Sequence, residues 1–265
     1  MRISPCTAFI GDRQVLFDSS LFNEPPIHLF DGDTLDRQDL LTGHAAGRGQ
    51  VWFFRYAGRE MVLRHFRRGG LLRHFMHDSY LRPAARHSRS WREWQLLQRM
   101  YAQGLPVPRP VAAQARIRGP LYSADLITER IPGARSLAEH LRQAPLDEES
   151  WRRIGATVGL FHERDIWHSD LNAYNILLDD SGSVYLIDFD SGREGASGLG
   201  KRRNLSRLLR SLRKIRAATP FFAFDESFWQ CLLQGYRNPH RHAALNPVAA
   251  AQEAQAGKLR KSGSL

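Results

Sequence analysis

The chain contains 265 residues, of which 42% are hydrophobic and 25% charged, so its composition predicts a folded globular protein and excludes a disordered one. No apolar run approaches the roughly 18 residues of a membrane-spanning helix, and acidic residues interrupt the first thirty positions, so we expect neither a bilayer span nor a secretory signal peptide. The formal net charge of +11, from 38 basic and 27 acidic residues, predicts attraction to polyanions such as nucleic acid, anionic lipid or a phosphorylated substrate.

Apolar runs in the N-terminal half predict mainly strands. Two of them, at 51–56 and 61–66, read as an antiparallel pair joined by a turn. A weaker strand signal covers 14–17, and another strand is expected at 121–131, ahead of a Pro-Gly turn. Large apolar residues that recur every three or four positions predict a helix over 86–102.

The C-terminal half instead predicts helices, at 137–142, 148–165 and 203–216. Between the last two, apolar runs at 175–178 and 184–187 flank a turn rich in Asp, Ser and Gly and predict a short hairpin. The order of elements indicates an α+β chain. We expect three parts: a β-rich unit at 1–131, a helical unit at 132–242 and a flexible tail at 243–265.

The hairpin and the loop before it carry the clearest chemical signal. His168, Asp170 and Asn175 follow the pattern H-x-D-L-x-x-x-N, and Asp188 begins an Asp-Phe dipeptide after the hairpin. Phosphoryl transfer needs a carboxylate that orients or accepts the proton of the attacking hydroxyl, a role that fits Asp170. It also needs oxygen ligands for Mg²⁺, which fits Asn175 and Asp188. For His168 we favour structural support of the loop over acid–base chemistry.

Five runs resemble one known group of proteins. They are VLRHFRRGGL at 62–71, SRSWREWQLL at 88–97, HSDLNAYNILL at 168–178, YLIDFD at 185–190 and NLSRLLRSLRK at 204–214. Together they resemble the protein-kinase-like superfamily and, within it, the lipopolysaccharide-core kinases that act on 3-deoxy-D-manno-octulosonic acid (Kdo). The resemblance implies a bilobal protein-kinase-like fold, with a small antiparallel sheet in the N-terminal lobe and a larger, mostly helical C-terminal lobe.

The same resemblance implies an activity and a location. It implies an ATP- and Mg²⁺-dependent kinase that phosphorylates the 4-hydroxyl of Kdo in an anionic glycolipid, Kdo-lipid IVA, during synthesis of the lipopolysaccharide inner core. The enzyme would then be a peripheral protein on the cytoplasmic face of the bacterial inner membrane. An oligomeric state does not follow from the sequence.

The kinase roles, carried over residue by residue, expose several departures. No lysine precedes Lys201, so the residue that holds the nucleotide phosphates on the 61–66 strand is expected to be Arg64, with Glu93 as its acidic partner. Asp190 stands where a glycine usually follows Asp-Phe, and Asn172 stands where kinases of serine and threonine carry a lysine. The second departure disfavours a protein substrate.

Other nucleotide contacts are expected from glycines and from the link between the lobes. Gly47, Arg48 and Gly49 form a short glycine-rich turn whose N–H groups can approach phosphate oxygens. Glu129 and Ile131 lie in the expected hinge, where backbone groups read adenine in kinases.

The helix at 203–216 has an apolar face and six basic residues with no acidic one. We expect Arg207 and Arg210, with Arg67 and Arg68, to contact anionic groups of the acceptor or of the membrane surface. A solvated face of an ordinary packed helix is the alternative.

Two other functions stay open at this stage. A kinase of a soluble sugar or an aminoglycoside-like molecule would use the same residues, so only the acceptor distinguishes it. A nucleic-acid-binding protein would explain the net charge, but the basic residues are spread along the chain and no known nucleic-acid module is present, so no nucleic-acid partner is expected.

Overall fold

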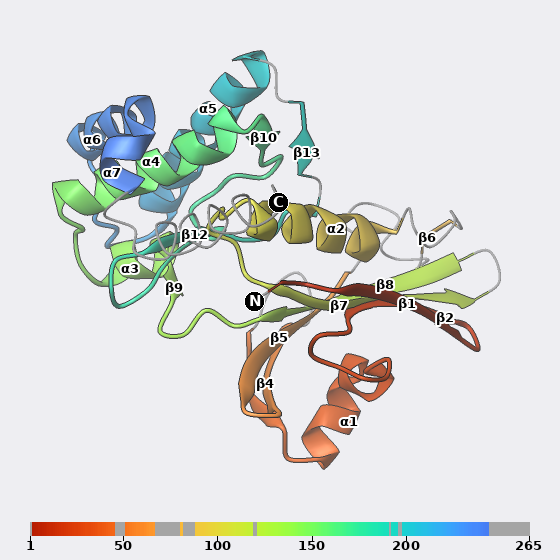
Figure 1. The fold of residues 1–265 in the computed structure, drawn as a ribbon. Helices are drawn as coiled ribbons and strands as arrows, with labels where there is room; N and C mark the ends of the chain where they lie inside the picture. Colours follow the sequence, from red (N-terminus) through yellow and green to blue (C-terminus); the bar gives the residue numbers. More distant parts are fainter. Residues whose placement is uncertain are drawn as a thin grey trace. The chain divides into compact units, whose positions relative to one another are not determined.

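The computed structural model describes residues 2–45, 51–66, 80–81, 88–118, 121–190, 192–195 and 198–243. The chain divides into two compact units, coloured along the sequence in Figure 1. The N-terminal unit comprises Met1–Gln98 and Pro108–Arg130, and the C-terminal unit comprises Arg99–Val107 and Ile131–Leu265. The predicted α+β class is confirmed, since the first unit holds a large sheet and the second is mainly helical. The expected tail lies outside the described residues from 244 onward.

An eight-stranded antiparallel sheet forms the N-terminal unit. Its order is β1-β2-β7-β8-β5-β4-β3, with β6 paired to β8. The predicted pair of strands is confirmed as β4 and β5, in which Val51 lies opposite Arg64. The strands are β1 (Pro5–Ile10), β2 (Arg13–Asp18), β3 (Leu41–Ala45), β4 (Val51–Tyr56), β5 (Arg59–His65), β6 (Tyr80–Leu81), β7 (Pro110–Arg118) and β8 (Leu121–Glu129).

Side-chain alternation along β5 separates the two faces of this sheet. Met61 and Leu63 are buried in an apolar cluster with residues of η1 (Ile27–Phe30) and of α1 (Gly32–Arg37). Arg64 projects from the other face, toward α2 (Arg89–Ala102). In Figure 1, α1 and α2 lie on opposite sides of the sheet. The sheet therefore has an apolar core on one face and presents Arg64 on the other.

Helices dominate the C-terminal unit. They are α3 (Leu137–Gln143), α4 (Glu148–Glu163), α5 (Gly198–Ala218), α6 (Glu226–Arg237) and α7 (Pro239–Ala243). The predicted helix at 148–165 is confirmed as α4, which begins after Asp147 because its carboxylate accepts a hydrogen bond from Ser150 N at 2.7 Å. The described helices include none long and apolar enough to cross a membrane.

Short strands complete this unit. The predicted hairpin is confirmed as β11 (Ile176–Leu178) and β12 (Val184–Leu186), to which β9 (Arg135–Ser136) adds a third strand. A separate pair, β10 (Ile166–Trp167) and β13 (Arg193–Glu194), flanks the segment between α4 and α5. These pairings fix both ends of the segment that carries the H-x-D motif.

Candidate functional site

The N-terminal unit pairs Arg64 with Glu93. The Arg64 guanidinium, on β5, forms an ion pair with Glu93 of α2 through Nη2 and Oε2, and its Cζ lies 4.6 Å from the centre of the Phe66 ring. Glu93 is only 2% exposed, whereas the Arg64 side chain is 22% exposed. The buried carboxylate thus holds a partly exposed guanidinium, and a guanidinium can pair with phosphate oxygens as it does with carboxylates.

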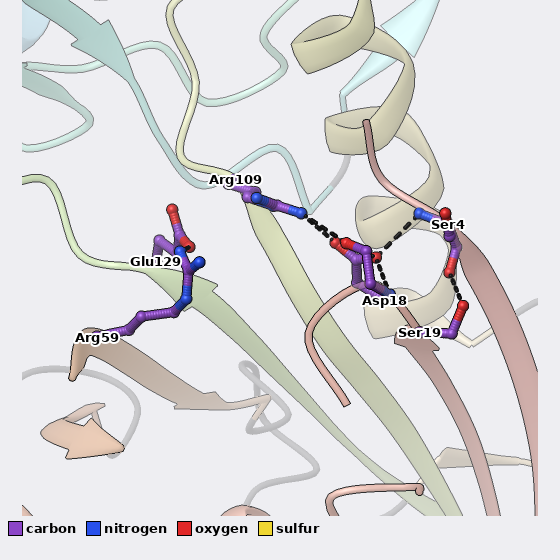
Figure 2. Close-up of polar contacts among 7 residues, drawn as sticks. Ser4, Asp18, Ser19, Arg59, Arg109 and Glu129 are labelled. Atoms are coloured by element: carbon purple, nitrogen blue, oxygen red, sulfur yellow. Dashed lines mark hydrogen bonds and ion pairs between the residues drawn. The ribbon is translucent and has the colours of Figure 1, made fainter. Parts of the chain in front are cut away.

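The end of β8 is tied into the same sheet. Glu129 Oε1 lies 2.6 Å from Arg59 Nη1, a pair shown in Figure 2, and Glu129 N donates to Arg109 O at 2.9 Å. Arg130 N donates to Glu60 O at 2.9 Å. The N–H groups of Glu129 and Arg130 are therefore engaged within the N-terminal unit. In the C-terminal unit, the carbonyl of Ile131 accepts a hydrogen bond from Ala134 N at 3.4 Å.

Five of the expected nucleotide and acceptor contacts belong to segments that the structure does not describe. Gly47, Arg48, Gly49, Arg67 and Arg68 lie outside the described residues.

In the C-terminal unit, the loop of residues 168–175 (the 168–175 loop) leads directly into β11. Asn175 O accepts a hydrogen bond from Ile187 N at 3.1 Å, one pair beyond the last residues of the hairpin. This bond places Asn175 and Asp188 at the same end of β11 and β12. Asp188 has a φ of 65°, a left-handed conformation that aspartate tolerates better than most residues. The positive φ thus falls on Asp188 and not on Asp190, the residue found in place of glycine.

His168 ties the loop to the segment after the hairpin. Its side chain is buried, and its Nε2 donates to Ile187 O at 2.7 Å while Nδ1 accepts from Asp170 N at 3.1 Å. A ring that donates from one nitrogen and accepts at the other is a neutral imidazole. The ring centre lies 4.6 Å from that of Phe189. His168 therefore fixes the position of Asp170 relative to the end of β12.

Asp170 presents its carboxylate to solvent, with 65% of the side chain exposed. Its Oδ1 lies 3.1 Å from Arg207 Nη1, and its Oδ2 accepts from Asn172 Nδ2 at 3.3 Å. Arg207, expected as an acceptor contact, thus has Asp170 as an ion-pair partner. Arg210 is exposed, and the described part of the chain offers it no ion-pair partner.

The donor set at the end of the hairpin suits a hard cation. Asn175 is largely buried, and its Nδ2 donates to Asp170 O at 3.0 Å, so the amide Oδ1 is the atom of this side chain that would bind a cation. Asp188 adds a carboxylate. Oxygen atoms of amides and carboxylates are the protein ligands that Mg²⁺ prefers, so these two residues fit the ion.

One residue of this site escaped prediction from the sequence. Asn204 of α5 is buried and hydrogen-bonds both the N–H and the C=O of His168. A signal for it exists, because Asn204 is in phase with the buried Leu208, Leu212 and Ile215. An amide on the apolar face of a helix indicates a specific polar partner.

Comparison with known proteins agrees with this geometry. Residues 33–236 match the Lipopolysaccharide kinase (Kdo/WaaP) family. A 3-deoxy-D-manno-octulosonic acid kinase of Vibrio parahaemolyticus is 41% identical over 204 residues, which cover 77% of this chain and 86% of the relative. Enzymes of the same name from Photobacterium profundum and Actinobacillus succinogenes are 40% identical over 228 residues (86% and 96% covered) and 38% identical over 209 residues (76% and 87%).

Proposed function

We propose that this chain, which belongs to the Lipopolysaccharide kinase (Kdo/WaaP) family and is a kinase, transfers the γ-phosphoryl group of ATP to the 4-hydroxyl of Kdo in Kdo-lipid IVA. The observation that carries the proposal is the placement of three oxygen-bearing side chains. Asp170 and Asn175 lie on the 168–175 loop and are joined by a hydrogen bond, and Asp188 follows the hairpin strand whose end is paired with Asn175. The names of the similar enzymes supply the acceptor class.

In this proposal the exposed Asp170 carboxylate accepts a hydrogen bond from the acceptor hydroxyl and takes its proton. The hydroxyl oxygen bonds to the γ-phosphorus of ATP while the bond from that phosphorus to the β–γ bridging oxygen breaks, and ADP leaves. His168 acts only by holding the loop. Asn175 and Asp188 would hold Mg²⁺, which offsets negative charge on the phosphates. The carboxylate and the metal ligands are then fixed by one short segment of chain, so their spacing is set before substrates bind.

Nucleotide contacts are assigned in the same way. Arg64, held by Glu93, would pair with phosphate oxygens, the role that a lysine fills in protein kinases. Gly47, Arg48 and Gly49 are proposed to cover the phosphates. Since the N–H groups of Glu129 and Arg130 and the carbonyl of Ile131 are engaged, we assign adenine recognition to the N–H of Ile131 rather than to that of Glu129.

Basic residues are proposed to recognise the acceptor. Kdo carries a carboxylate and the lipid A precursor carries phosphates, so Arg210, with Arg67 and Arg68, would bind anions of the glycolipid. The net charge of +11 favours a peripheral position on the anionic cytoplasmic face of the inner membrane.

The test compares two aspartates of similar exposure. Asp170→Asn should lower kcat with radiolabelled ATP and Kdo-lipid IVA by about 10²-fold or more, since general bases contribute at least that much. Asp165→Asn, which alters a 64% exposed aspartate paired with Lys201, should retain activity. Lipid IVA without Kdo should accept no phosphate. Phosphorylation of soluble sugars but not of the glycolipid, or full activity of Asp170→Asn, would contradict the proposal.

A further inference from the structure

Helix α5 contacts the 168–175 loop at three points with a regular spacing. Asn204 contacts His168, Arg207 contacts Asp170, and Ser211 contacts Ala173. The spacings of three and four residues place the three side chains on one face of the helix. One polar stripe of α5 therefore follows the loop from its first residue to the residue just before Tyr174.

Asn204 is the most buried member of this stripe, at 1% exposure. Its Oδ1 accepts from His168 N at 2.9 Å, and its Nδ2 donates to His168 O at 2.5 Å. The same Oδ1 accepts from His162 Nε2 at 3.2 Å, and His162 Nδ1 in turn accepts from the Tyr236 hydroxyl at 3.0 Å. A hydrogen-bonded chain from α4 and α6 thus orients the Asn204 amide, which binds the backbone of the loop.

Arg207 contacts the carboxylate of Asp170, the loop residue proposed to act on the acceptor hydroxyl. Its Nη1 lies 3.1 Å from Asp170 Oδ1, while Asn172 Nδ2 lies 3.3 Å from Oδ2. Each oxygen of the carboxylate therefore has one donor, which fixes the plane of the group and leaves a second lone pair on each oxygen. Asn172 is neutral, so the cation beside Asp170 comes from the helix and not from the loop.

A second arginine of α5 forms an ion pair that does not involve the 168–175 loop. Arg213 binds Glu226 through two hydrogen bonds, of 2.8 and 3.0 Å, at the start of α6. The side chains of that pair are 54% and 47% exposed, close to the 53% and 65% of Arg207 and Asp170. Arg213 is thus a matched reference: the same residue type, on the same helix, paired with a carboxylate outside the loop.

We propose that Asn204, Arg207 and Ser211 form a template that positions the 168–175 loop, and that Arg207 orients the Asp170 carboxylate rather than binding the acceptor. This inference rests on the proposed function, because Asp170 is the group that acts on the hydroxyl. Asn204 and Ser211 set the loop backbone, whereas Arg207 acts on the carboxylate itself. All three are positioning residues.

Steady-state kinetics test the role of Arg207. Arg207→Gln should lower kcat roughly 10- to 100-fold, since a misplacement of about 1 Å can cost 10²-fold, with less than about threefold change in KM for ATP and for Kdo-lipid IVA. Arg207→Lys should recover part of kcat, and Arg213→Gln should stay near the wild type. A raised acceptor KM at unchanged kcat would show an acceptor contact, and equal losses in Arg207→Gln and Arg213→Gln would show a general effect of helix charge. Either result overturns the assignment.

Hydrogen–deuterium exchange tests the template without any substrate. The His168 amide donates to Asn204, and the Ala173 amide donates to Ser211. Asn204→Ala should therefore speed exchange of the His168 amide, and Ser211→Ala that of the Ala173 amide, each by about fivefold, the effect of losing one hydrogen bond. Arg213→Gln should leave both amides unchanged. Should Asn204→Ala fail to fold, Ser211→Ala still decides, and unchanged exchange in it overturns the template. An inactive wild-type protein would contradict the proposed function alone.

Discussion

Asp18 and Arg109 form a fully buried ion pair in the N-terminal unit, with Oδ2 and Nη2 2.5 Å apart (Figure 2). The Asp18 side chain is 0% exposed and that of Arg109 only 3%. Asp18 Oδ1 also accepts from Ser4 N, Ser20 N and the Ser20 hydroxyl, at 2.7 to 3.0 Å. One carboxylate thus fastens the start of the chain and the end of β2 to the residue that precedes β7.

Arg109→Met is expected to lower the free energy of unfolding by about 3 kcal/mol, the lower end for breaking a buried ion pair, because the serine hydrogen bonds still satisfy Asp18 in part. Urea denaturation followed by circular dichroism measures the loss. Arg116→Met is the control, since Arg116 of β7 pairs with Asp12 at 2.7 Å on the surface. An equal loss in both variants would show that burial of the Asp18 pair adds nothing.

The pH dependence of Asp18 has a definite sign. Burial alone would raise the pKa of the Asp18 carboxyl, but hydrogen bonds from Ser4, Ser20 and Arg109 outweigh burial and hold the pKa below the ordinary 3.8. The stabilisation is therefore complete above pH 3.8 and is lost as the pH falls through the folded-state pKa. Asp18→Asn should be less stable than the wild type at pH 7, and the difference should shrink below pH 3.8. A constant difference across this range would contradict the assignment.

Glu93→Gln is expected to raise KM for ATP about tenfold, because the neutral amide loses the charge-assisted grip on Arg64. At saturating ATP, the KM for the acceptor should change little. Glu60→Gln provides the control, since Glu60 lies on β5, the strand that carries Arg64, and pairs with Arg55 and Arg130 instead. Lower thermal stability with an unchanged KM for ATP would mean that the Arg64–Glu93 pair serves only the fold.

Two glycines allow α4 and α6 to approach closely. A Cβ added at Gly155 would lie 1.9 Å from Leu232 O, and one added at Gly235 would lie 1.9 Å from Arg152 O. Each clash is with backbone and cannot be relieved by a rotamer change, so Gly155→Ala and Gly235→Ala should each cost about 3 kcal/mol or more.

Gly198, at the first residue of α5, is the matched control for these substitutions. A Cβ there would meet nothing within 4 Å, so Gly198→Ala should leave the melting temperature unchanged or raise it slightly. Equal melting temperatures for Gly155→Ala and Gly198→Ala would contradict the packing described for α4 and α6.

Local patterns predicted the elements whose own residues determine them. Helix α4 follows from the spacing of its apolar residues and from the Asp147 cap, and the β4–β5 pair follows from two apolar runs around a turn. The 168–175 loop was predicted for the same reason, since its motif spans eight neighbouring positions. Such features depend little on distant parts of the chain.

Elements that depend on distant partners were missed. Strand β7 is rich in alanine, and Ala112, Ala113 and Ala115 are fully buried, yet alanine has a low strand propensity, so only pairing with β2 and β8 selects the strand. Strand β1 is exposed on both faces and shows no alternation. The partner of Arg207 was missed likewise, because 37 positions separate it from Asp170.

His162 should make the stability of the C-terminal unit depend on pH. Burial lowers the pKa of its imidazole below the ordinary 6.5, and the positive charge of Lys201 lowers it further, whereas the hydrogen bond to Asn204 only partly offsets these effects. Below pH 6.5 the unfolded chain takes up a proton that the folded protein resists, so stability is full above pH 6.5 and falls as the pH drops toward the folded-state pKa.

Between pH 7.5 and pH 5.5 the wild type should therefore lose more unfolding free energy than His162→Gln, although the variant should be less stable at pH 7.5. Urea denaturation at the two pH values measures both differences, and an equal loss in the two proteins would exclude His162 as the titrating group. Because Asn204 connects His162 to His168, the protection of the His168 amide, measured as the ratio of its intrinsic to its observed exchange rate, should fall in the wild type as the pH drops from 7.5 to 5.5.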